Sequence, residues 1–430
     1  MDLLTLFKKL PLELRYIVTN YDHSTPFRIL SKSELKKYDW FNLIKINFSL
    51  TYSKTEATNE EIMRVYYDNC RSKKSKIACN ENHTVIVNGK TLMGAGHGAS
   101  GQLGQWQKEF SKGIFVKIDI GDVKDIVEVI AGGYNTIIRQ KDGTLMICGS
   151  FSYDSPEHHR DPYSLVEIRG IPKNISSVTC GDQHIIIRLT DGTLMGCGYN
   201  KYGQLGLGDN KSRSTFVEIP GIPKNISSVT CGANNSIIKL TDGTLFVCGY
   251  NSEGQLGLSH NHCVNLFEEI KGLPKNIVQV VCGNHTIIRL SDGTLMSCGE
   301  DLPGDGKSRN TFEEIRGVPK NIAQVVCGSN FTIIKLTNGI LMGSGSNQFG
   351  QLGFPECDQK IHFEKIPHAP KNIARINCGP QNTFIQLRNG KILSCGDNSS
   401  GQLGIEKVAK LTQPRFTNIK SPKGNHCTIS

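Results

Sequence analysis

The chain has no run of about 18 apolar residues, and this absence argues against a membrane-spanning helix. Residues 1–9 lack the charge order of a secretory signal peptide, so we expect a protein that is not secreted. The chain also has no Cys-x-x-Cys motif, although it contains 15 cysteines. Ten of them stand directly before glycine at regular intervals, which favours reduced core thiols in a cytoplasmic or nuclear protein over disulfides.

Catalytic and cofactor-binding motifs are missing too. No nucleophile–base–orienter set stands out, so we expect no enzyme activity, no cofactor and no metal. Residues 96–101 match the dinucleotide fingerprint G-x-G-x-x-G, but no parallel strand–helix unit follows. Residues 304–308 resemble the end of a phosphate-binding loop, yet Asp301 stands where its first glycine is needed.

Three histidines, His83, His184 and His285, follow an amide residue at equivalent places along the chain. A ring of histidines is a candidate metal site. Other units have asparagine or phenylalanine at this place, which favours a hydrogen-bonding role at the start of a strand.

A twelve-residue segment occurs twice in the chain. Gly-Ile-Pro-Lys-Asn-Ile-Ser-Ser-Val-Thr-Cys-Gly stands at residues 170–181 and again at 221–232. The closing cysteine recurs, with degenerate unit starts at the first two positions, as Cys79, Ala131, Cys180, Cys231, Cys282, Cys327 and Cys378. The starts are 45 to 52 residues apart, and a fixed period near 50 indicates a repeat architecture.

Each unit also contains a hairpin signal. Asn or Asp followed by Gly lies between two β-rich runs, and this dipeptide predicts a type I′ turn with positive φ at both central residues. The glycines of the seven turns are Gly89, Gly143, Gly192, Gly243, Gly293, Gly339 and Gly390.

A fourth run of alternating apolar and polar residues closes each unit, from residues 115–118 in the first to 416–419 in the seventh. Seven units of four short strands can bury their faces on one another by closing into a ring. The sequence therefore predicts an all-β fold, a seven-bladed β-propeller of four-stranded blades with the Cys-Gly strands innermost. An open β-solenoid is the alternative, although its coils are usually shorter and lack a regular hairpin turn.

Five units carry Gly-Gln-Leu-Gly between the third and fourth strands, at residues 101–104, 203–206, 254–257, 350–353 and 401–404. With the Asp-Gly hairpin and the Cys-Gly strand, this pattern resembles the regulator of chromosome condensation repeat, a family of seven-bladed propellers. The match covers about residues 76–420. The second and fifth units depart from it at residues 151–154 and 303–306, and distinct contacts are expected at such irregular loops.

Residues 1–70 do not follow the repeat and are predicted to form a small bundle of three short helices. Apolar residues from Leu3 to Val18 recur at roughly helical spacing. Ser31 and Glu34 form a capping-box pattern for a second helix that ends near Tyr38. A third helix is expected over about residues 40–48.

Leu10-Pro11-Leu12-Glu13-Leu14, with Ile17 at a later apolar position, resembles the start of an F-box. The F-box is a helical module that docks on a Skp-family adaptor of cullin ubiquitin ligases. The resemblance implies that Leu10, Pro11, Leu14 and Ile17 form an apolar adaptor-binding surface. The alternative is a plain helical cap that shields one face of the propeller.

These patterns divide the chain into four parts. They are the helical F-box-like segment (1–70), a basic linker (71–78), the propeller (79–420) and a C-terminal tail (421–430). The linker reads Arg-Ser-Lys-Lys-Ser-Lys from Arg71, in a chain of net charge +10. Such a run can serve nuclear import or bind nucleic acid, but it has no interleaved aromatics. A solvated linker is therefore favoured, and nucleic acid is not expected as a partner.

Three functions remain open. The first is a non-enzymatic scaffold that holds a protein ligand on a propeller face and serves as substrate receptor of a cullin-type ubiquitin ligase. The second, implied by the propeller resemblance, is nucleotide exchange on a Ran-like GTPase together with chromatin binding. That family expels the nucleotide with an inserted β-hairpin wedge, for which units of 45 to 52 residues leave no room. The third is a general scaffold with no link to ubiquitin.

Overall fold

The structure is a computed structural model of the 430-residue chain. It describes residues 22–70, 76–104, 113–121, 125–150, 163–300, 306–356, 358–405 and 412–419, together with Phe7, Leu10, Leu14, Arg15, Thr19 and Val123. Most of the predicted linker and the whole C-terminal tail therefore lie outside the described residues.

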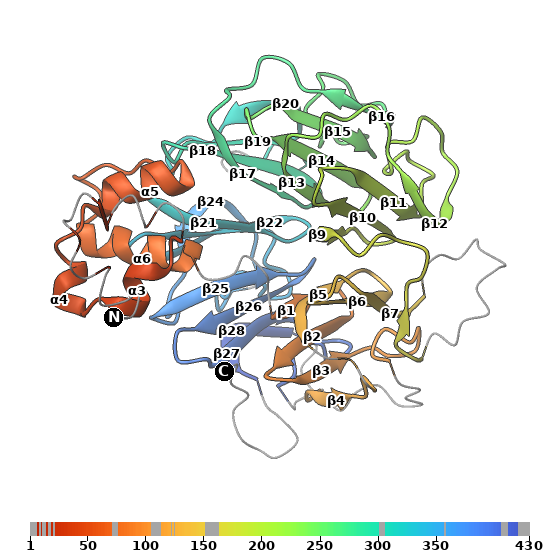
Figure 1. Cartoon of the computed structure of the whole chain (residues 1–430), viewed down its shortest axis with the longest axis horizontal. Coiled ribbons are helices and arrows are strands. Elements are labelled where there is room, and N and C mark those ends of the chain that lie inside the picture. The colour runs from red at the N-terminus through yellow and green to blue at the C-terminus, as the bar shows by residue number, and fades with distance from the viewer. Residues whose placement is uncertain are drawn as a thin grey trace.

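Each repeat folds as its own antiparallel sheet of four consecutive strands, and seven such sheets form seven blades (Figure 1). Blades 1 to 4 consist of β1 (Ile77–Cys79), β2 (His83–Asn88), β3 (Thr91–Gly96), β4 (Val116–Ile118), β5 (Ile126–Ala131), β6 (Asn135–Gln140), β7 (Leu145–Gly149), β8 (Val166–Glu167), β9 (Ile175–Cys180), β10 (His184–Leu189), β11 (Leu194–Gly198), β12 (Arg213–Glu218), β13 (Ile226–Cys231), β14 (Asn235–Leu240), β15 (Leu245–Gly249) and β16 (Val264–Glu269). Blades 5 to 7 consist of β17 (Ile277–Cys282), β18 (His285–Leu290), β19 (Leu295–Gly299), β20 (Arg309–Glu314), β21 (Ile322–Cys327), β22 (Phe331–Leu336), β23 (Leu341–Gly345), β24 (Lys360–Lys365), β25 (Ile373–Cys378), β26 (Asn382–Leu387), β27 (Ile392–Asp397) and β28 (Thr412–Asn418). The predicted seven-bladed propeller is confirmed.

The fourth strands of blades 3 to 7 begin earlier than the apolar–polar alternation predicts, and they end before the closing isoleucine. In blade 3 the polar residue Arg213 pairs with Gly198 of the third strand, after a register shift between Gly196 and Gly198. Ladder hydrogen bonds use the backbone alone, so an outer strand can extend through side chains that carry no apolar signal.

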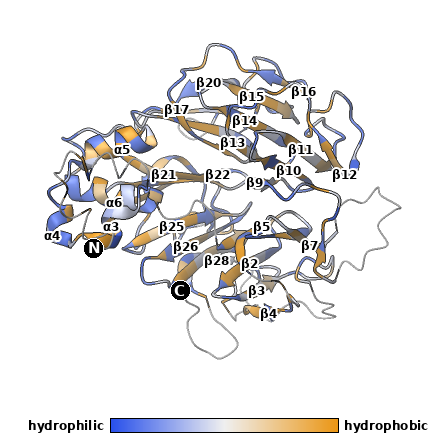
Figure 2. Ribbon diagram, in the orientation of Figure 1, coloured by the Kyte–Doolittle hydropathy of each residue, from blue (hydrophilic) through white to orange (hydrophobic). Residues whose placement is uncertain are grey.

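The second strand of each blade forms the core because neighbouring blades cover both of its faces. In β10 the three isoleucines Ile185, Ile186 and Ile187 are at most 1% exposed. Figure 2 shows orange, hydrophobic strands joined by loops with much hydrophilic blue. Strands that are apolar on both sides, as in a buried sheet, therefore supply the packing between blades.

The ring closes without an exchanged strand, since each sheet is built from consecutive strands only. Blade 7 meets blade 1 directly, and Figure 1 shows the blue β25 and β26 beside the orange β1 and β2. Asn382 Nδ2 donates to the carbonyl of Asn80 at 3.0 Å, and Asn377 Nδ2 donates to that of Ile77 at 3.2 Å. An apolar cluster that includes Phe115 and Phe384 fills the same seam.

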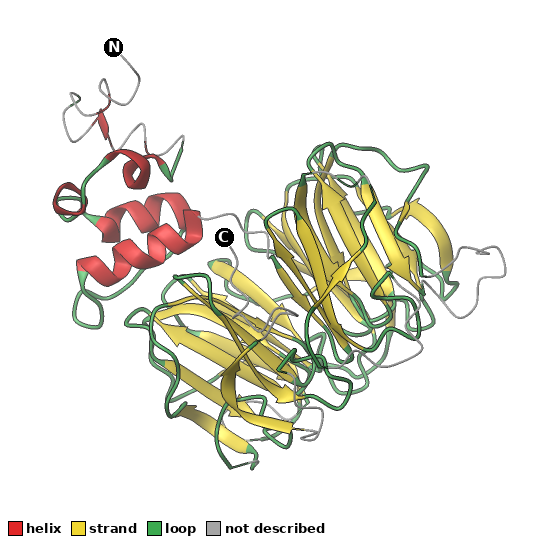
Figure 3. Ribbon diagram, turned by 90° about the horizontal axis from the view of Figure 1, so that it is seen from below, coloured by secondary structure: helices red, strands yellow, loops and turns green. Residues whose placement is uncertain are grey.

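The N-terminal helices are α3 (Thr25–Ile29), α4 (Lys32–Leu35), α5 (Trp40–Phe48) and α6 (Asn59–Cys70), and they lie to one side of the strands (Figure 3). The capping box of α4 is confirmed: the Glu34 N–H donates to Ser31 Oγ, and the Ser31 N–H donates to the Glu34 carboxylate. The third predicted helix coincides with α5. The first falls mostly outside the described residues. None of the described helices is long and apolar enough to span a membrane.

The sequence reading missed α6, the longest described helix. Thr58 and Glu61 form a second reciprocal cap at its start, with hydrogen bonds of 2.8 and 3.3 Å. Its buried residues Ile62, Val65 and Tyr66 contact a core centred on Trp40. The Thr-x-x-Glu pattern before an apolar run was the signal that could have revealed it.

The Asp-Gly turns differ from the predicted type I′ hairpins. Gly243 has φ of +88°, but Asp242 is not among the residues with positive φ. The hairpin closes with a three-residue loop, because Leu240 N–H bonds to the carbonyl of Thr244 and Gly243 N–H to that of Leu240. The Asp242 carboxylate accepts from the Thr244 N–H at 2.9 Å, which holds aspartate outside the left-handed region. A type I turn followed by a left-handed glycine describes this geometry.

We expect Gly243→Ala to destabilise the fold more than Gly339→Ala does. Both glycines have φ near +87°, so each alanine incurs similar strain, about 1 kcal/mol or more. A Cβ at Gly243 would lie only 1.9 Å from the carbonyl oxygen of Lys275, whereas nothing lies within 4 Å of one at Gly339. The clash should add about 1–3 kcal/mol. Urea unfolding of the two variants measures the difference, and equal losses would contradict this account of the turn.

Candidate functional site

The propeller presents two different ends. In blade 3, His184 pairs with Gly198 at one end of the hairpin and Arg188 pairs with Leu194 at the other. The connections between first and second strands and between third and fourth strands meet at the first end, here called the loop face. The Asp-Gly hairpins and the connections between blades meet at the second end, here called the turn face.

The Gly-Gln-Leu-Gly loops join neighbouring blades at the loop face. The carbonyl of Gln102 accepts a 2.7 Å hydrogen bond from the hydroxyl of Thr136 in the next blade, and the thiol of Cys148 lies 3.6 Å from the same oxygen. The same pairing of hydroxyl and thiol recurs at Gln204, Gln255 and Gln351. The loop motif and the cysteine of the third strand thus serve the contact between blades.

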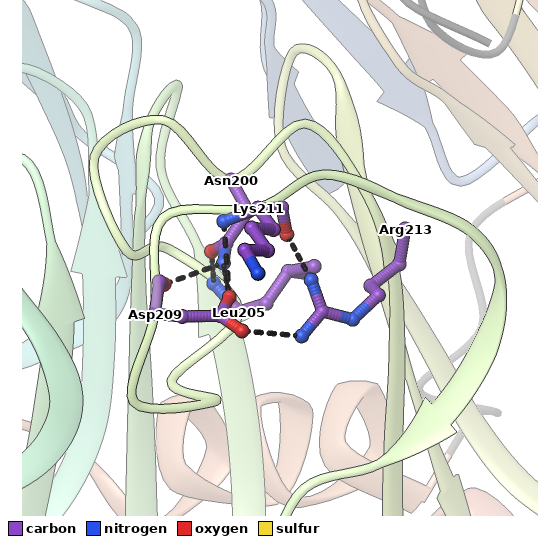
Figure 4. Close-up of polar contacts among 5 residues, drawn as sticks. All are labelled: Asn200, Leu205, Asp209, Lys211 and Arg213. Atoms are coloured by element: carbon purple, nitrogen blue, oxygen red, sulfur yellow. Dashed lines mark hydrogen bonds and ion pairs between the residues drawn. The ribbon is translucent and has the colours of Figure 1, made fainter.

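A buried asparagine organises four of the five loops, those of blades 3, 4, 6 and 7. In blade 3, Asn200 Nδ2 donates to the carbonyl of Asp209 at 2.8 Å, and Asn200 Oδ1 accepts from the N–H of Leu205 at 2.8 Å (Figure 4). Arg213 forms an ion pair of 2.7 Å with the Asp209 carboxylate. The bond to the backbone N–H recurs at Asn251, Asn347 and Asn398. Because the loop itself uses these polar groups, we interpret the cluster as a structural support.

The three equivalent histidines connect blades in the same way. His83 Nε2 lies 3.0 Å from the hydroxyl of Thr136, and that hydroxyl donates its own proton to Gln102, so the histidine is the donor. His184 and His285 make the corresponding contacts to Ser236 and Thr332. Burial lowers the pKa of each of the three rings to about 4. The predicted hydrogen-bonding role is confirmed, although the partner belongs to the next blade.

The Cys-Gly strands line the axis, as predicted. A cavity of about 150 Å³ at the loop-face end of the axis is lined by all seven blades and by the Cys-Gly residues of five of them. Desolvation raises the pKa of its thiols, to about 12 for Cys79 and Cys231. In the described part of the chain every cysteine is free, and no cluster of three or more metal-ligating side chains occurs. These thiols are therefore protonated, weak nucleophiles.

An aromatic patch that the sequence reading missed lies on the loop face between blades 3 and 4. The ring of Tyr202 meets that of Tyr250 edge to face at 5.1 Å and that of Tyr199 at 6.0 Å. Tyr202 is 36% exposed. Tyrosine is enriched at protein interfaces because its ring is apolar and its hydroxyl is polar. The tyrosines beside the glycine loops of blades 3 and 4 were the available signal.

The helical segment docks on the turn face through residues 50–70. Tyr52 donates its hydroxyl proton to the carbonyl of Ile322 at 3.0 Å, and the N–H of Thr51 donates to the carbonyl of Ser291 at 2.8 Å. The Asp68 carboxylate of α6 lies 2.8 Å from Arg388 and 3.4 Å from Lys335. Burial lowers the pKa of Lys335, an effect that the Asp68 charge partly offsets. The helical segment thus contacts one face of the propeller, as the alternative of a helical cap supposed.

The structure describes two of the four predicted adaptor-binding residues. Leu10 is half-buried and packs against the helical core, whereas Leu14 is 45% exposed. Pro11 and Ile17 lie outside the described residues. The adaptor-binding surface therefore stays a prediction.

The irregular loops are described only in part. Residues 151–154 and 303–305 lie outside the described positions. The distinctive loop of blade 4 is visible: its His260 and His262 rings stack at 5.6 Å, and the backbone carbonyls of both accept from Asn251. Cys263 beside them is exposed.

Comparison with known families identifies the repeat. Two models described as Regulator of chromosome condensation (RCC1) repeat match the chain, one at residues 175–204, 226–255 and 322–351 and the other at 191–238 and 242–288. The matched segments lie in blades 3 to 6. The chain thus carries RCC1 repeats in a seven-bladed propeller.

The curated relatives align with about half of this chain. The secretion-regulating guanine nucleotide exchange factor of Bos taurus is 28% identical over 52% of this chain and 39% of its own length. The X-linked retinitis pigmentosa GTPase regulator of Mus musculus is 32% identical over 48% and 22%. The probable E3 ubiquitin-protein ligase HERC4 of Homo sapiens is 30% identical over 50% and 17%. The chain covers less than two-fifths of each relative's length.

Solved structures support the same fold. Human WBSCR16 superposes with a TM-score of 0.62 at 21% identity, covering 72% of this chain and 84% of its own. Prp20p from Saccharomyces cerevisiae superposes with a TM-score of 0.62 at 20% identity, covering 70% and 80%. At these identities the likeness concerns the fold alone.

The low histidine pKa values predict a loss of stability in acid. An unfolded histidine takes up a proton near pH 6.5, but the buried rings do so only near pH 4. Stability from this source is complete above pH 6.5 and falls as the pH drops towards 4. His184→Asn introduces the asparagine that occurs at the equivalent positions Asn135 and Asn235. It should reduce the dependence of the unfolding free energy on pH by about 1.4 kcal/mol per pH unit.

Urea titrations at pH 4.5 to 6.5 measure this slope. The control is His362→Asn, because His362 is exposed in the folded chain. Equal slopes in the wild type and His184→Asn would show that the His184 ring is not held neutral.

Proposed function

Because the chain carries RCC1 repeats in a closed ring, we propose that it is a non-enzymatic protein-interaction scaffold that serves as the substrate receptor of a cullin-type ubiquitin ligase. The propeller would hold a protein ligand on its loop face. The N-terminal helices would recruit a Skp-family adaptor. The thiols of the core would stay reduced in the cytosol or nucleus, where such ligases work.

The observation that carries the proposal is that the docking contacts and the exposed motif residue lie in different parts of the helical segment. Tyr52 and Asp68 make the contacts with the turn face. Leu14, from the F-box-like motif, is instead 45% exposed. Its exposure leaves this side chain accessible to an adaptor. The described docking contacts lie in residues 50–70 and leave Leu14 exposed.

The loop face is the surface we assign to the ligand. The described helices contact the opposite, turn face. Buried asparagines and carbonyl bonds hold the loops rigidly, so a ligand would not have to order them on binding. The patch of Tyr199, Tyr202 and Tyr250 is the favoured anchor. The relative HERC4, a probable E3 ubiquitin-protein ligase, also supports a link between such repeats and ubiquitin.

We expect the wild-type chain to co-purify with a Skp-family adaptor and Leu14→Asp to lose it. A carboxylate at the centre of an apolar contact should weaken binding by several kcal/mol, roughly a hundredfold or more. Leu266→Asp is the matched control, since Leu266 is 51% exposed but lies on the outer strand β16 of the propeller.

If the wild-type chain binds no adaptor, the ubiquitin-ligase hypothesis is wrong and the helical segment is a cap on the propeller. The chain would then be a general scaffold, the third of the functions considered. If Leu266→Asp also lost the adaptor, binding would not be specific to the F-box-like motif.

Nucleotide exchange on a Ran-like GTPase, with chromatin binding, is the second candidate function. The 28% identity to a secretion-regulating guanine nucleotide exchange factor favours it. The short, regular repeat units speak against it, because they leave no room for an inserted hairpin wedge.

We therefore expect the purified chain to leave the release of a fluorescent guanine nucleotide from a Ran-like GTPase at its intrinsic rate. An established exchange factor in the same assay provides the positive control. Acceleration well above the intrinsic rate would make exchange the leading function.

A further inference from the structure

A cleft lies between the N-terminal helices and the turn face of blades 4 to 7. Its volume is about 950 Å³, which is within the range of small-molecule sites. The helical segment contributes Lys45, Asn47 and Asp68 to its wall. Blades 4 to 6 contribute residues in or beside their first and second strands, and blade 7 contributes residues of its first strand.

The cleft is strongly cationic. Its lining includes Lys45, Lys239, Lys275, Arg289, Lys335 and Arg375. Asp68 is the only carboxylate among the described lining residues, and its charge is already shared by Lys335 and Arg388. Lys239, Arg289 and Lys335 are each at least nine-tenths buried. Like charges with little water around them repel one another, so an anion in the cleft would relieve the repulsion.

The repeat itself shows how the fold can neutralise such a cation. In blade 2, Arg139 on the second strand faces Glu128 on the first, and the two form an ion pair of 2.8 Å. The residues at the position of Glu128 are serine in blades 3 and 4, Gln279 in blade 5, Gln324 in blade 6 and Arg375 in blade 7. Around the cleft the acid is thus replaced by neutral residues and, in blade 7, by a further cation.

Contacts between blades explain only part of this charge. Arg289 and Lys335 donate to the carbonyls of Ile322 and Ile373 in the next blade, as Arg139 does to Ile175. Lys45 and Arg375 do not occupy that repeat position. Arg289 Nε is fully buried and is therefore not open to the cleft, so the wall attracts a ligand through its net positive charge.

We propose that this cleft binds a small molecule that carries several phosphate groups. Arginine forks and lysine ammonium groups are the side chains that bind phosphate, and Gln279, Gln324 and Asn377 add amide donors to the wall. Phe48 is the only aromatic among the described lining residues, so the wall recognises charge rather than a stacked base. The ligand bridges Lys45 on the helices and Arg375 on blade 7, and it strengthens the docking of the helical segment.

Calorimetric titration of the full chain with sodium tripolyphosphate at about 50 mM salt tests the proposal. We expect one site per chain, with an affinity that falls as salt rises. Arg375→Gln and Lys45→Gln should each weaken binding about tenfold. The matched control is Lys224→Gln, since Lys224 occupies the repeat position of Lys275 but does not line the cleft. Its affinity should equal that of the wild type.

A parallel titration with ATP distinguishes two sources of the phosphates. An affinity for ATP no higher than that for tripolyphosphate supports a ligand recognised through its phosphates alone. A markedly higher affinity for ATP would overturn the inference that the wall recognises charge rather than a base. Hexaglutamate that binds as tightly as tripolyphosphate would overturn the assignment to phosphate. Absence of binding at millimolar tripolyphosphate, or an unchanged affinity in both cleft variants, would overturn the site. Melting curves without ligand establish whether the two variants fold. Lys45→Gln should disturb folding less than Arg375→Gln, because Lys45 is exposed on helix α5.

Discussion

The contact between the loop of one blade and the second strand of the next is the interaction on which the ring depends. The faces of neighbouring blades are apolar, so a polar group between them must find a partner inside the protein. The carbonyl of Gln204 meets this need by accepting from the Ser236 hydroxyl, and His184 donates to the same hydroxyl. Each blade is therefore aligned by directional bonds as well as by packing.

The closing seam meets the same requirement only in part, and through other groups. Blade 1 has Ala95 where Cys148 stands in blade 2, and Thr84 Oγ1 is buried with no partner in the described part of the chain. Amide side chains of blade 7, among them Asn382 and Gln402, donate instead to backbone carbonyls of blade 1. Because no strand is exchanged across the seam, these bonds and the apolar cluster around Phe115 hold the ring closed.

Departures from the repeat coincide with the surfaces available for binding. Residues shared by the blades, such as the glutamine and asparagine of the glycine loops, are occupied by internal hydrogen bonds. Arg375 and the tyrosines near Tyr202 instead lie at a cleft and at an exposed patch. Docking of the helices on the turn face through Asp68 creates the cleft, and the described helices do not cover the loop face.

The sequence alone determined the seven blades, the innermost Cys-Gly strands and helices α4 and α5, because these depend on local signals repeated at fixed spacing. It was less reliable where long-range contacts decide the conformation. Asp242 was predicted to have positive φ, but its carboxylate bonds to Thr244 and the turn closes over three residues. The sequence suggested Leu14 as a binding residue but could not show that residues 50–70 carry the docking contacts. Only the tertiary structure brings Lys45, Arg289 and Arg375 to one cleft, since residues separated by more than 80 positions meet there through the closure of the ring and the docking of α6.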